Sequence, residues 1–219
     1  TTTLYAQWSV NAYDLKVYAY SNSASGLDNF ANNTVGGTVS FAEETGEKVE
    51  AKVNYGEVST LVAEAAEGNA FVGWYTDASF ANKVSSNASY TTPVMVVAGL
   101  TYYAKFTANK YTVSLEAGVG IARVSGAAEY LYGAEINISA EVEAGYTWSG
   151  WTGYVTTVSN PYSFTMPASD VELTSEYREH NYKVIFKAND GSETEATEEQ
   201  TFTYTETKAL TKNSFTREG

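Results

Sequence analysis

Most of the chain alternates apolar and polar residues with a period of two, which predicts strands with one face on a core. The clearest runs are YDLKVYAY (13–20), YTVSLEA (111–117) and YKVIFKA (182–188). We expect further strands in similar segments separated by glycine turns: 36–41, 48–55, 58–64, 70–75, 100–107, 121–125, 135–141, 146–151, 162–165 and 171–177. The fold class expected is all-β or β-dominated α+β, built of tandem small β-sheet repeat modules.

One segment has a composition that favours a helix, the alanine-rich TLVAEAAE (60–67). It aligns without gaps on NISAEVEA (137–144), which is β-branched and suits a strand. We therefore expect strands at both places.

An internal repeat is the strongest signal in the sequence. Residues 55–74 align with residues 132–151 without a gap, and seven of the twenty positions are identical: Tyr55/Tyr132, Gly56/Gly133, Ala63/Ala140, Glu64/Glu141, Gly68/Gly145, Gly73/Gly150 and Trp74/Trp151. The match continues more loosely through Ser86-Asn87 on Ser159-Asn160, and Thr92-Pro93 on Met166-Pro167.

A second pattern marks the junctions between repeats. An aromatic residue is followed five positions later by a Tyr that opens a strand, at Trp8/Tyr13, Phe106/Tyr111 and Tyr177/Tyr182. We expect residues 1–8 to end a preceding repeat, 13–106 to form repeat A with an insertion at 21–35, 111–177 to form repeat B, and 182–219 to form a truncated repeat C. Repeat C stops before its own Gly-Trp segment. We therefore expect a fragment of a longer array, with repeat C partly ordered unless it adds strands to repeat B or to a neighbouring chain.

The charge of the chain excludes two classes of partner. There are 26 acidic and 13 basic residues, a formal net charge of −13, and nucleic acid or anionic lipid needs a basic face. No apolar run approaches the roughly 20 residues of a membrane helix, so we expect no membrane insertion of this fragment.

The residue inventory leaves little room for catalysis. The chain has no Cys and one His, His180, which excludes thiolate sites, disulfides and multi-histidine metal sites. His180 lies in the polar linker 178–181, where we expect a solvated residue.

Carboxylate pairs are the remaining route to catalysis. Glu141 and Glu143 share a strand face, whereas the neighbours Glu43-Glu44 and Glu198-Glu199 point apart. Residues 189–193 could form a calcium-binding loop or a simple Asp-Gly hairpin turn, and we favour the hairpin turn. We predict no enzyme activity, no metal and no cofactor.

Together these motifs resemble the internalin B-type repeats, in standard and divergent forms, of bacterial cell-surface proteins. The residues that carry the likeness are LYAQW (4–8), the YTV and YKV openings, the Asn-Asp-Gly turn (189–191) and the segments AFVGW (70–74) and TWSGW (147–151). The resemblance implies small β-grasp-like modules strung as stalks or adhesive arms, at an extracellular location on the bacterial surface or cell wall.

The Gly-Trp segments are the expected anchors of each repeat. A Gly inside a strand often marks a bulge, and a buried indole contributes several kcal/mol. We assign this role to Trp74, Trp151, Gly73, Gly150, Tyr55 and Tyr132. Aromatic rings also stack on sugars, so the possible ligand-binding residues are Trp148, Tyr102, Tyr103 and Tyr130. The role of Trp148 remains open, because it could belong to the core, to an interface between modules or to a ligand site.

Two function classes remain open. The first is a structural spacer, in which the four-residue linkers 9–12, 107–110 and 178–181 limit swivel between neighbouring repeats. The second is an adhesive module that binds a glycan or an extracellular protein through exposed aromatics or the 21–35 insertion. A contiguous aromatic patch would favour the second class.

Overall fold

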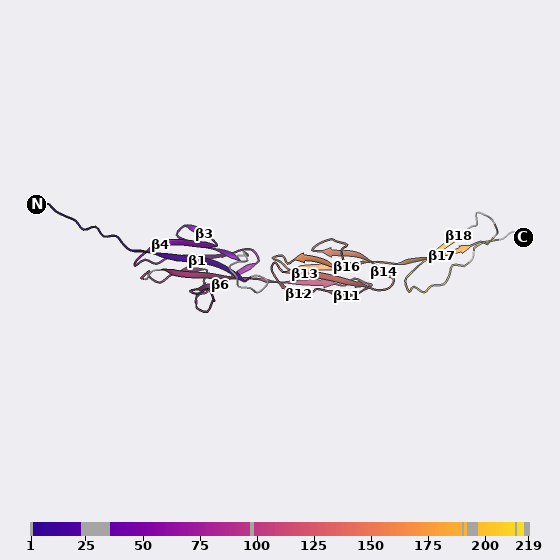
Figure 1. Ribbon diagram of the computed structural model, residues 1–219. Helices are drawn as coiled ribbons and strands as arrows, with labels where there is room; N and C mark the ends of the chain where they lie inside the picture. Colours follow the sequence, from indigo (N-terminus) through magenta and orange to yellow (C-terminus); the bar gives the residue numbers. More distant parts are fainter. Residues whose placement is uncertain are drawn as a thin grey trace. The chain divides into compact units, whose positions relative to one another are not determined.

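The computed structural model describes residues 2–22, 36–96, 99–189, 191, 197–212 and 214–216 (Figure 1). These residues form strands and turns, and no helix is found among them. The all-β alternative of the expected fold class is therefore confirmed. Most of the 21–35 insertion lies outside the described residues.

The chain divides into two compact units. Unit 1 comprises Thr1–Tyr111, Glu129–Glu135 and Thr165–Asp170, and unit 2 comprises Thr112–Ala128, Ile136–Phe164 and Val171–Gly219. The division into repeats A, B and C stays a prediction from the sequence, and the repeat names are used below for those residue ranges.

Repeat A contains two sheets of mainly antiparallel strands. One sheet has the order β4-β1-β9-β6-β7 and the other the order β3-β2-β5-β8. The strands are β1 (Ala12–Asn22), β2 (Gly37–Phe41), β3 (Glu44–Gly46), β4 (Lys48–Asn54), β5 (Thr60–Ala65), β6 (Asn69–Tyr75), β7 (Lys83–Ser85), β8 (Ser89–Thr91) and β9 (Leu100–Ala108). Residues 60–65 of the ambiguous segment 60–67 are thus a strand, as expected.

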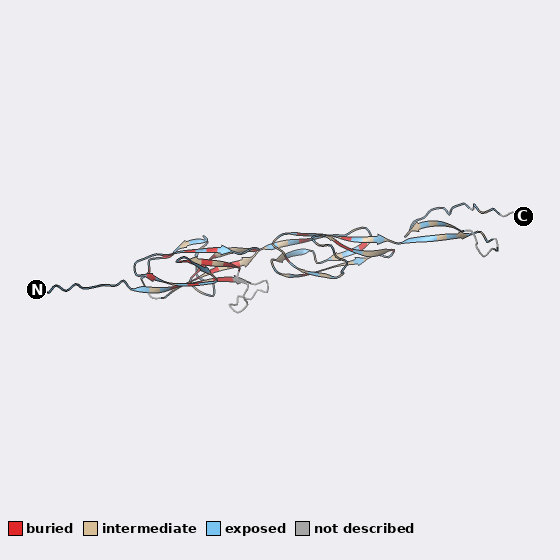
Figure 2. Cartoon of the chain, turned by 90° about the horizontal axis from the view of Figure 1, so that it is seen from above, coloured by how far each residue is buried: buried red, intermediate tan, exposed pale blue. Residues whose placement is uncertain are grey.

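The core of repeat A draws on both sheets, and Figure 2 shows its buried residues distributed along the strands. Burial alternates along β2, which is the pattern of a strand with one face on a core. Fully buried side chains include Leu15, Val17, Ala104 and Phe106 from the first sheet, and Val39 and Leu61 from the second.

The first and last strands of repeat A lie side by side and run parallel. Eight residue pairs register β1 on β9, from Leu15 opposite Leu100 to Asn22 opposite Thr107. Because the two strands run in the same direction, the chain enters repeat A at one end of this sheet and leaves it at the other. In repeat B, β10 (Lys110–Glu116) and β16 (Val171–Glu179) are parallel in the same way.

Repeat B has the same strand orders as repeat A without the two short strands β3 and β7. Its sheets are β12-β10-β16-β14 and β11-β13-β15. The remaining strands are β11 (Ile121–Ser125), β12 (Ala128–Leu131), β13 (Glu135–Val142), β14 (Tyr146–Gly153) and β15 (Tyr162–Thr165). Buried side chains of unit 2 include Val113, Ile136, Ile138, Trp151 and Leu173.

Repeat C contains a two-stranded sheet of β17 (Asn181–Lys187) and β18 (Thr197–Thr203). The pair is antiparallel, with Asn181 opposite Thr203, as β1 is antiparallel to β4. Within the part of the chain that the structure describes, no helix is long and apolar enough to cross a membrane.

Candidate functional site

The Gly-Trp segments form a bulge in the same place in both repeats. The register of β6 on β9 shifts between Phe71 and Gly73, and that of β14 on β16 shifts between Trp148 and Gly150. A Cβ on Gly73 would lie 2.7 Å from the carbonyl oxygen of Ser85, and one on Gly150 2.7 Å from that of Thr157. The glycines thus let a neighbouring backbone approach closely, and the expected bulge is confirmed.

Trp74 and Trp151 follow these bulges and are fully buried. Phe71 packs edge-on against Trp74 at 5.7 Å between ring centroids, and Trp148 packs edge-on against Trp151 at 5.2 Å. Trp148 is half-buried and donates from Nε1 to the carbonyl of Val158 at 2.9 Å. Trp148 therefore contacts the ring of Trp151, and its ligand-binding role stays a prediction.

The two indole N–H groups differ in their partners. Trp74 Nε1 donates to the carbonyl of Ala88 at 3.1 Å, whereas the buried Nε1 of Trp151 has no hydrogen-bond partner among the described residues. A buried donor without a partner carries a desolvation cost. The buried indole N–H is thus hydrogen-bonded in repeat A, whereas in repeat B it has no partner among the described residues.

The Tyr-Gly turns that follow β4 and β12 are fixed by the same two backbone bonds. Gly56 donates to Met95 at 2.9 Å and Met95 to Glu57 at 2.7 Å; Gly133 donates to Met166 at 3.0 Å and Met166 to Ala134 at 2.8 Å. Met166 therefore corresponds to Met95. The looser sequence alignment, which placed Met166 on Thr92, is therefore wrong at this position. The cause is that repeat A has more residues than repeat B between the Tyr-Gly turn and this methionine.

Tyr132 begins the second of these turns and lies against Gly68, inside unit 1. A Cβ on Gly68 would overlap the ring of Tyr132. The linker residue Asn109 joins the two, since its N–H donates to the Gly68 carbonyl at 2.8 Å and its carbonyl accepts from Tyr132 N–H at 2.8 Å. We call this group of three residues the tyrosine-glycine junction.

A second tyrosine-glycine junction lies inside unit 2. A Cβ on Gly145 would overlap the ring of Tyr204, and the linker N–H of His180 donates to the Gly145 carbonyl at 2.8 Å. His180 holds the place of Asn109, two residues before the Tyr that opens the next strand. The imidazole is exposed, with Nε2 2.6 Å from Thr147 Oγ1.

Tyr55 is the corresponding residue of repeat A and is 54% exposed. Its N–H donates to the carbonyl of Asn11 at 2.7 Å, as Tyr132 N–H does to Asn109. Tyr55 thus makes the same backbone hydrogen bond to its linker as Tyr132 does, but its ring is exposed.

The tyrosines proposed as ligand sites have different surroundings. The expectation that Tyr102 lies on the surface is wrong, because its position on β9 faces the core and leaves it 3% exposed. Burial raises the pKa of Tyr102 to about 12. Tyr103, on the other face of β9, stacks on Tyr18 at 5.5 Å, and Tyr130 on β12 is half-buried.

Sequence reasoning missed one group of surface aromatics. Tyr162 and Phe164 share a face of β15 and stack at 5.9 Å, and Tyr154 lies 5.5 Å from Phe164. Tyr154 is 49% exposed and the other two are half-buried. Spacing of two on one strand is the signal that indicates this pair, although it says nothing of Tyr154.

The carboxylates lie in ordinary surface contacts. Glu141 on β13 faces Arg123 on β11, with 3.4 Å between the charged atoms and both side chains more than 60% exposed. Glu141 and Arg123 thus form an exposed cross-strand ion pair. Among the described residues no three His, Cys, Asp or Glu side chains gather as a metal site would require.

Two family matches cover both repeats. Residues 111–181 match the "Divergent InlB B-repeat domain" and residues 38–105 match the "Listeria-Bacteroides repeat domain". These are repeat-domain families of bacterial surface proteins, and they are typically structural, non-enzymatic modules.

Curated relatives come from Evansella cellulosilytica. One, named "Putative membrane protein", is 28% identical over 206 residues, which is 92% of this chain and 26% of the relative. Another, named "Putative Gly-rich membrane protein", is 28% identical over 195 residues, or 87% of this chain and 19% of the relative. The chain thus spans about a quarter or less of these relatives. Their names and the repeat families suggest a cell-envelope location.

A similar solved structure is that of the Bacillus anthracis TIE protein. The identity is 9% and the TM-score 0.43, over 88% of this chain and 44% of the other.

Proposed function

We propose that the chain is a non-enzymatic spacer in an extracellular stalk of a bacterial surface protein, because residues 38–105 match the Listeria-Bacteroides repeat domain and residues 111–181 match the divergent InlB B-repeat domain. The role of the spacer is to hold neighbouring repeats at a fixed separation. Its site is the tyrosine-glycine junction rather than a binding pocket.

The observation that carries this proposal is the recurrence of that junction. Tyr132 covers Gly68 and Tyr204 covers Gly145, and a linker N–H binds the glycine carbonyl at 2.8 Å in each case. Only one residue lies between the strands at each junction, Asn109 or His180. A connection of one residue that is hydrogen-bonded to the glycine and flanked by a ring has fewer conformations than a free four-residue linker. The junction therefore restricts swivel about the linker.

Electron paramagnetic resonance distance measurements would test this proposal. The chain has no Cys, so Glu64→Cys on β5 and Glu172→Cys on β16, both exposed, give one spin-labelled pair without background. We expect a single narrow distance distribution. Tyr132→Ser should broaden it, because the ring that covers Gly68 is lost.

Tyr55→Ser is the matched control, since Tyr55 starts the same turn and its ring is exposed. It should leave the distribution unchanged. A broad distribution in the unaltered chain, or no effect of Tyr132→Ser, would contradict the spacer function.

A second candidate function is adhesion to a glycan through Tyr154, Tyr162 and Phe164. The observation that favours it is their grouping on one surface of unit 2, with ring centroids 5.5 and 5.9 Å apart. Saturable binding on a glycan panel, lost in Tyr154→Ala and kept in Tyr55→Ala, would support adhesion. If the chain binds no member of a panel of glycans and matrix proteins, adhesion is contradicted and the spacer function is the one that remains.

A further inference from the structure

The lysines of repeat A gather on one face of the sheet β4-β1-β9-β6-β7. Residues 13–106 contain five Lys and ten acidic residues, so the repeat as a whole is acidic. On β1, β4 and β9 buried side chains alternate with side chains that face outward, away from the core. Only two acidic residues, Asp14 and Glu50, lie in the strands of this sheet. All five lysines lie on the outward face: Lys16 on β1, Lys48 and Lys52 on β4, Lys83 on β7 and Lys105 on β9.

A row of five side chains crosses this outward face from one edge of the sheet to the other. Tyr18 on β1 lies opposite Lys48 on β4 and opposite Tyr103 on β9. Tyr103 lies opposite Tyr75 on β6, which lies opposite Lys83 on β7. Residues directly opposite each other share a face of a sheet, so two lysines flank three tyrosines.

The rings at the centre of this row contact one another. Tyr18 and Tyr103 are half-buried, and their rings stack with 5.5 Å between centroids. Lys48 Nζ lies 5.5 Å from the centroid of the Tyr18 ring. Because tyrosine combines an apolar ring with a polar hydroxyl, the row suits a ligand that has both apolar and hydroxyl-bearing surfaces.

A strained loop residue adds one more ring to this face. Phe80, between β6 and β7, has a φ of +57°, a left-handed conformation that bulky side chains rarely adopt. Its ring packs edge-on against Tyr20 at 4.9 Å and against Tyr75 at 5.1 Å. Lys105 Nζ lies 4.4 Å from the centroid of the Phe80 ring. Strained residues of this kind cluster at functional sites, where the surrounding structure holds them in place.

The charge of this face is opposite in sign to that of the whole chain. Its strands carry a net charge of +3, from five lysines against Asp14 and Glu50, whereas the chain carries −13. The three lysines of β1 and β4 pair with these two carboxylates at 2.9, 3.1 and 3.4 Å. Within the described residues no ion pair involves Lys83 or Lys105. These two ammonium groups are therefore available to an anionic ligand.

We propose that this face binds a short acidic oligosaccharide, a chain of sugar rings that carry carboxylates. The tyrosines contact the sugar rings, and the lysines bind the carboxylates through charge-assisted hydrogen bonds. With 4.7–4.9 Å between neighbouring strands, the row spans roughly 19 Å and accommodates several rings. The site uses neither tyrosine-glycine junction and none of Tyr154, Tyr162 and Phe164, so it is independent of both functions proposed above.

The acidic excess of the chain favours a short ligand over a long polyanion. A chain of net charge −13 repels nucleic acid or a long acidic polymer that extends beyond the face. A ligand short enough to lie within the face meets mainly the lysines. Because exposed charge contacts contribute little each, we expect a dissociation constant on the order of 0.1–1 mM.

Titration of the isotope-labelled full chain with tetragalacturonate, followed through its backbone amide signals, tests the proposal. We expect saturable shifts at Tyr18, Tyr75 and Tyr103. The affinity should fall as salt is added, because salt screens exposed charges. If no saturable shift appears at these residues up to millimolar concentrations of the tetrasaccharide, the proposal is overturned.

Two double variants separate the charge of this face from the charge of the chain. Lys48→Gln with Lys83→Gln should weaken binding about fivefold, because the row loses a charge at each end. Lys183→Gln with Lys208→Gln removes the same charge from unit 2 and should bind as the unaltered chain does. Equal affinities of the two double variants would overturn the proposal.

Matched ligands separate the contribution of the rings from that of the charges. The fully methyl-esterified tetrasaccharide keeps the rings without the charges and should bind about tenfold more weakly. A tetra-aspartate peptide with blocked ends carries four carboxylates without sugar rings, and it should also bind about tenfold more weakly. If either ligand binds as tightly as tetragalacturonate, the face does not recognise an acidic sugar.

Discussion

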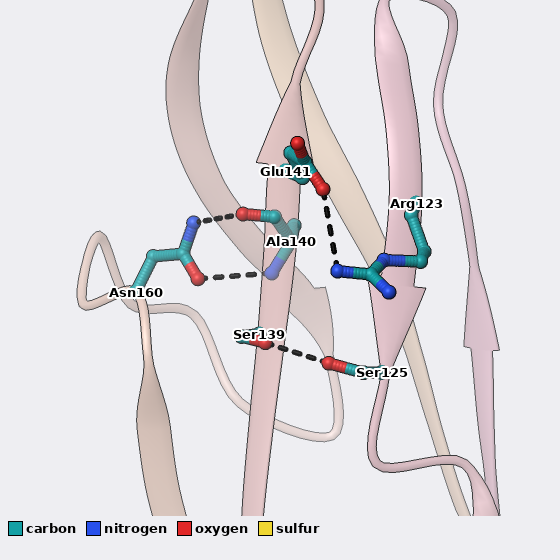
Figure 3. Close-up of polar contacts among 6 residues, drawn as sticks. All are labelled: Arg123, Ser125, Ser139, Ala140, Glu141 and Asn160. Carbon is teal, nitrogen blue, oxygen red and sulfur yellow. Dashed lines mark hydrogen bonds and ion pairs between the residues drawn. The ribbon is translucent and has the colours of Figure 1, made fainter.

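The side-chain amide of Asn160 makes two hydrogen bonds to the backbone of one residue, Ala140 (Figure 3). Asn160 Oδ1 accepts from Ala140 N–H at 2.9 Å, and Nδ2 donates to the Ala140 carbonyl at 2.7 Å. In repeat A the N–H of the corresponding residue Ala63 donates instead to the backbone carbonyl of Ala88 at 3.0 Å. The side chain of Asn160 thus replaces a backbone group beside β13.

Asn160→Asp should destabilise repeat B by about 1–3 kcal/mol, because it removes the donor and places a carboxylate beside the Ala140 carbonyl. Denaturant unfolding followed by amide signals of β13 measures the change. Asn137→Asp, on the same strand as Ala140 and exposed, is the control and should cost less. Equal losses in the two variants would contradict the assigned role.

Gly68→Ala should cost more stability than Gly56→Ala. Both glycines have positive φ, +72° and +89°, so both variants carry a left-handed strain of about 1–2 kcal/mol. Only at Gly68 does the added Cβ meet the ring of Tyr132, whereas nothing lies within 4 Å at Gly56. Thermal unfolding of both variants measures the difference.

The same pair should be repeated in a Tyr132→Ala background, where the extra cost of Gly68→Ala should vanish. If Gly68→Ala still costs more stability than Gly56→Ala when the Tyr132 ring is absent, the extra cost does not arise from the tyrosine-glycine junction.

Trp151→Ala should unfold repeat B and leave repeat A folded, because loss of a fully buried indole typically costs about 3–5 kcal/mol. Hydrogen exchange of β13 and β5 amides reports on the two repeats separately. Trp148→Ala, at a half-buried position, should cost less. If both repeats melt together, or if neither changes, the anchor role or the repeat division is wrong.

Asp77 should make the turn between β6 and β7 sensitive to acid. Its carboxylate accepts from the Ser79 hydroxyl, from Ala81 N–H at 3.0 Å and from Asn82 N–H at 2.7 Å, and these bonds lower the pKa from 3.8 to about 2. Because the pKa of Asp77 is lower in the folded than in the unfolded state, the ionised carboxylate stabilises the turn at any pH above the unfolded-state pKa. This stabilisation is lost as the pH falls through the folded-state pKa. The loss should occur between about pH 4 and 2.

The chemical shifts of the Ala81 and Asn82 amides, followed through this pH range, measure that titration. Asp77→Asn should abolish the acid step at these two amides. The remote pair Asp14 and Lys52, 2.9 Å apart, is unaltered in this variant and serves as an internal reference. A midpoint near the ordinary Asp value would contradict the contacts described.

The sequence predicted the strands and the bulges because both depend on local pattern. The β-branched residues of the aligned segment 137–144 decided the prediction of a strand at 60–67, and the Gly before Trp74 and Trp151 indicated the bulge. Tyr102 was assigned to the wrong face, since YY gives no sign of which neighbour points inward. The cover of Gly68 by Tyr132 could not be predicted either, because it joins residues of different repeats that no local pattern relates.

The parallel pairing of β1 with β9 determines how repeat A would respond to a pull along the chain. Because the chain enters at one end of this pair and leaves at the other, tension acts along both strands in opposite senses. The ladder over eight registered positions is then loaded in shear, so that its bonds must break together rather than one at a time from an end. A repeat built in this way resists mechanical extension far better than a hairpin pulled open from its two ends.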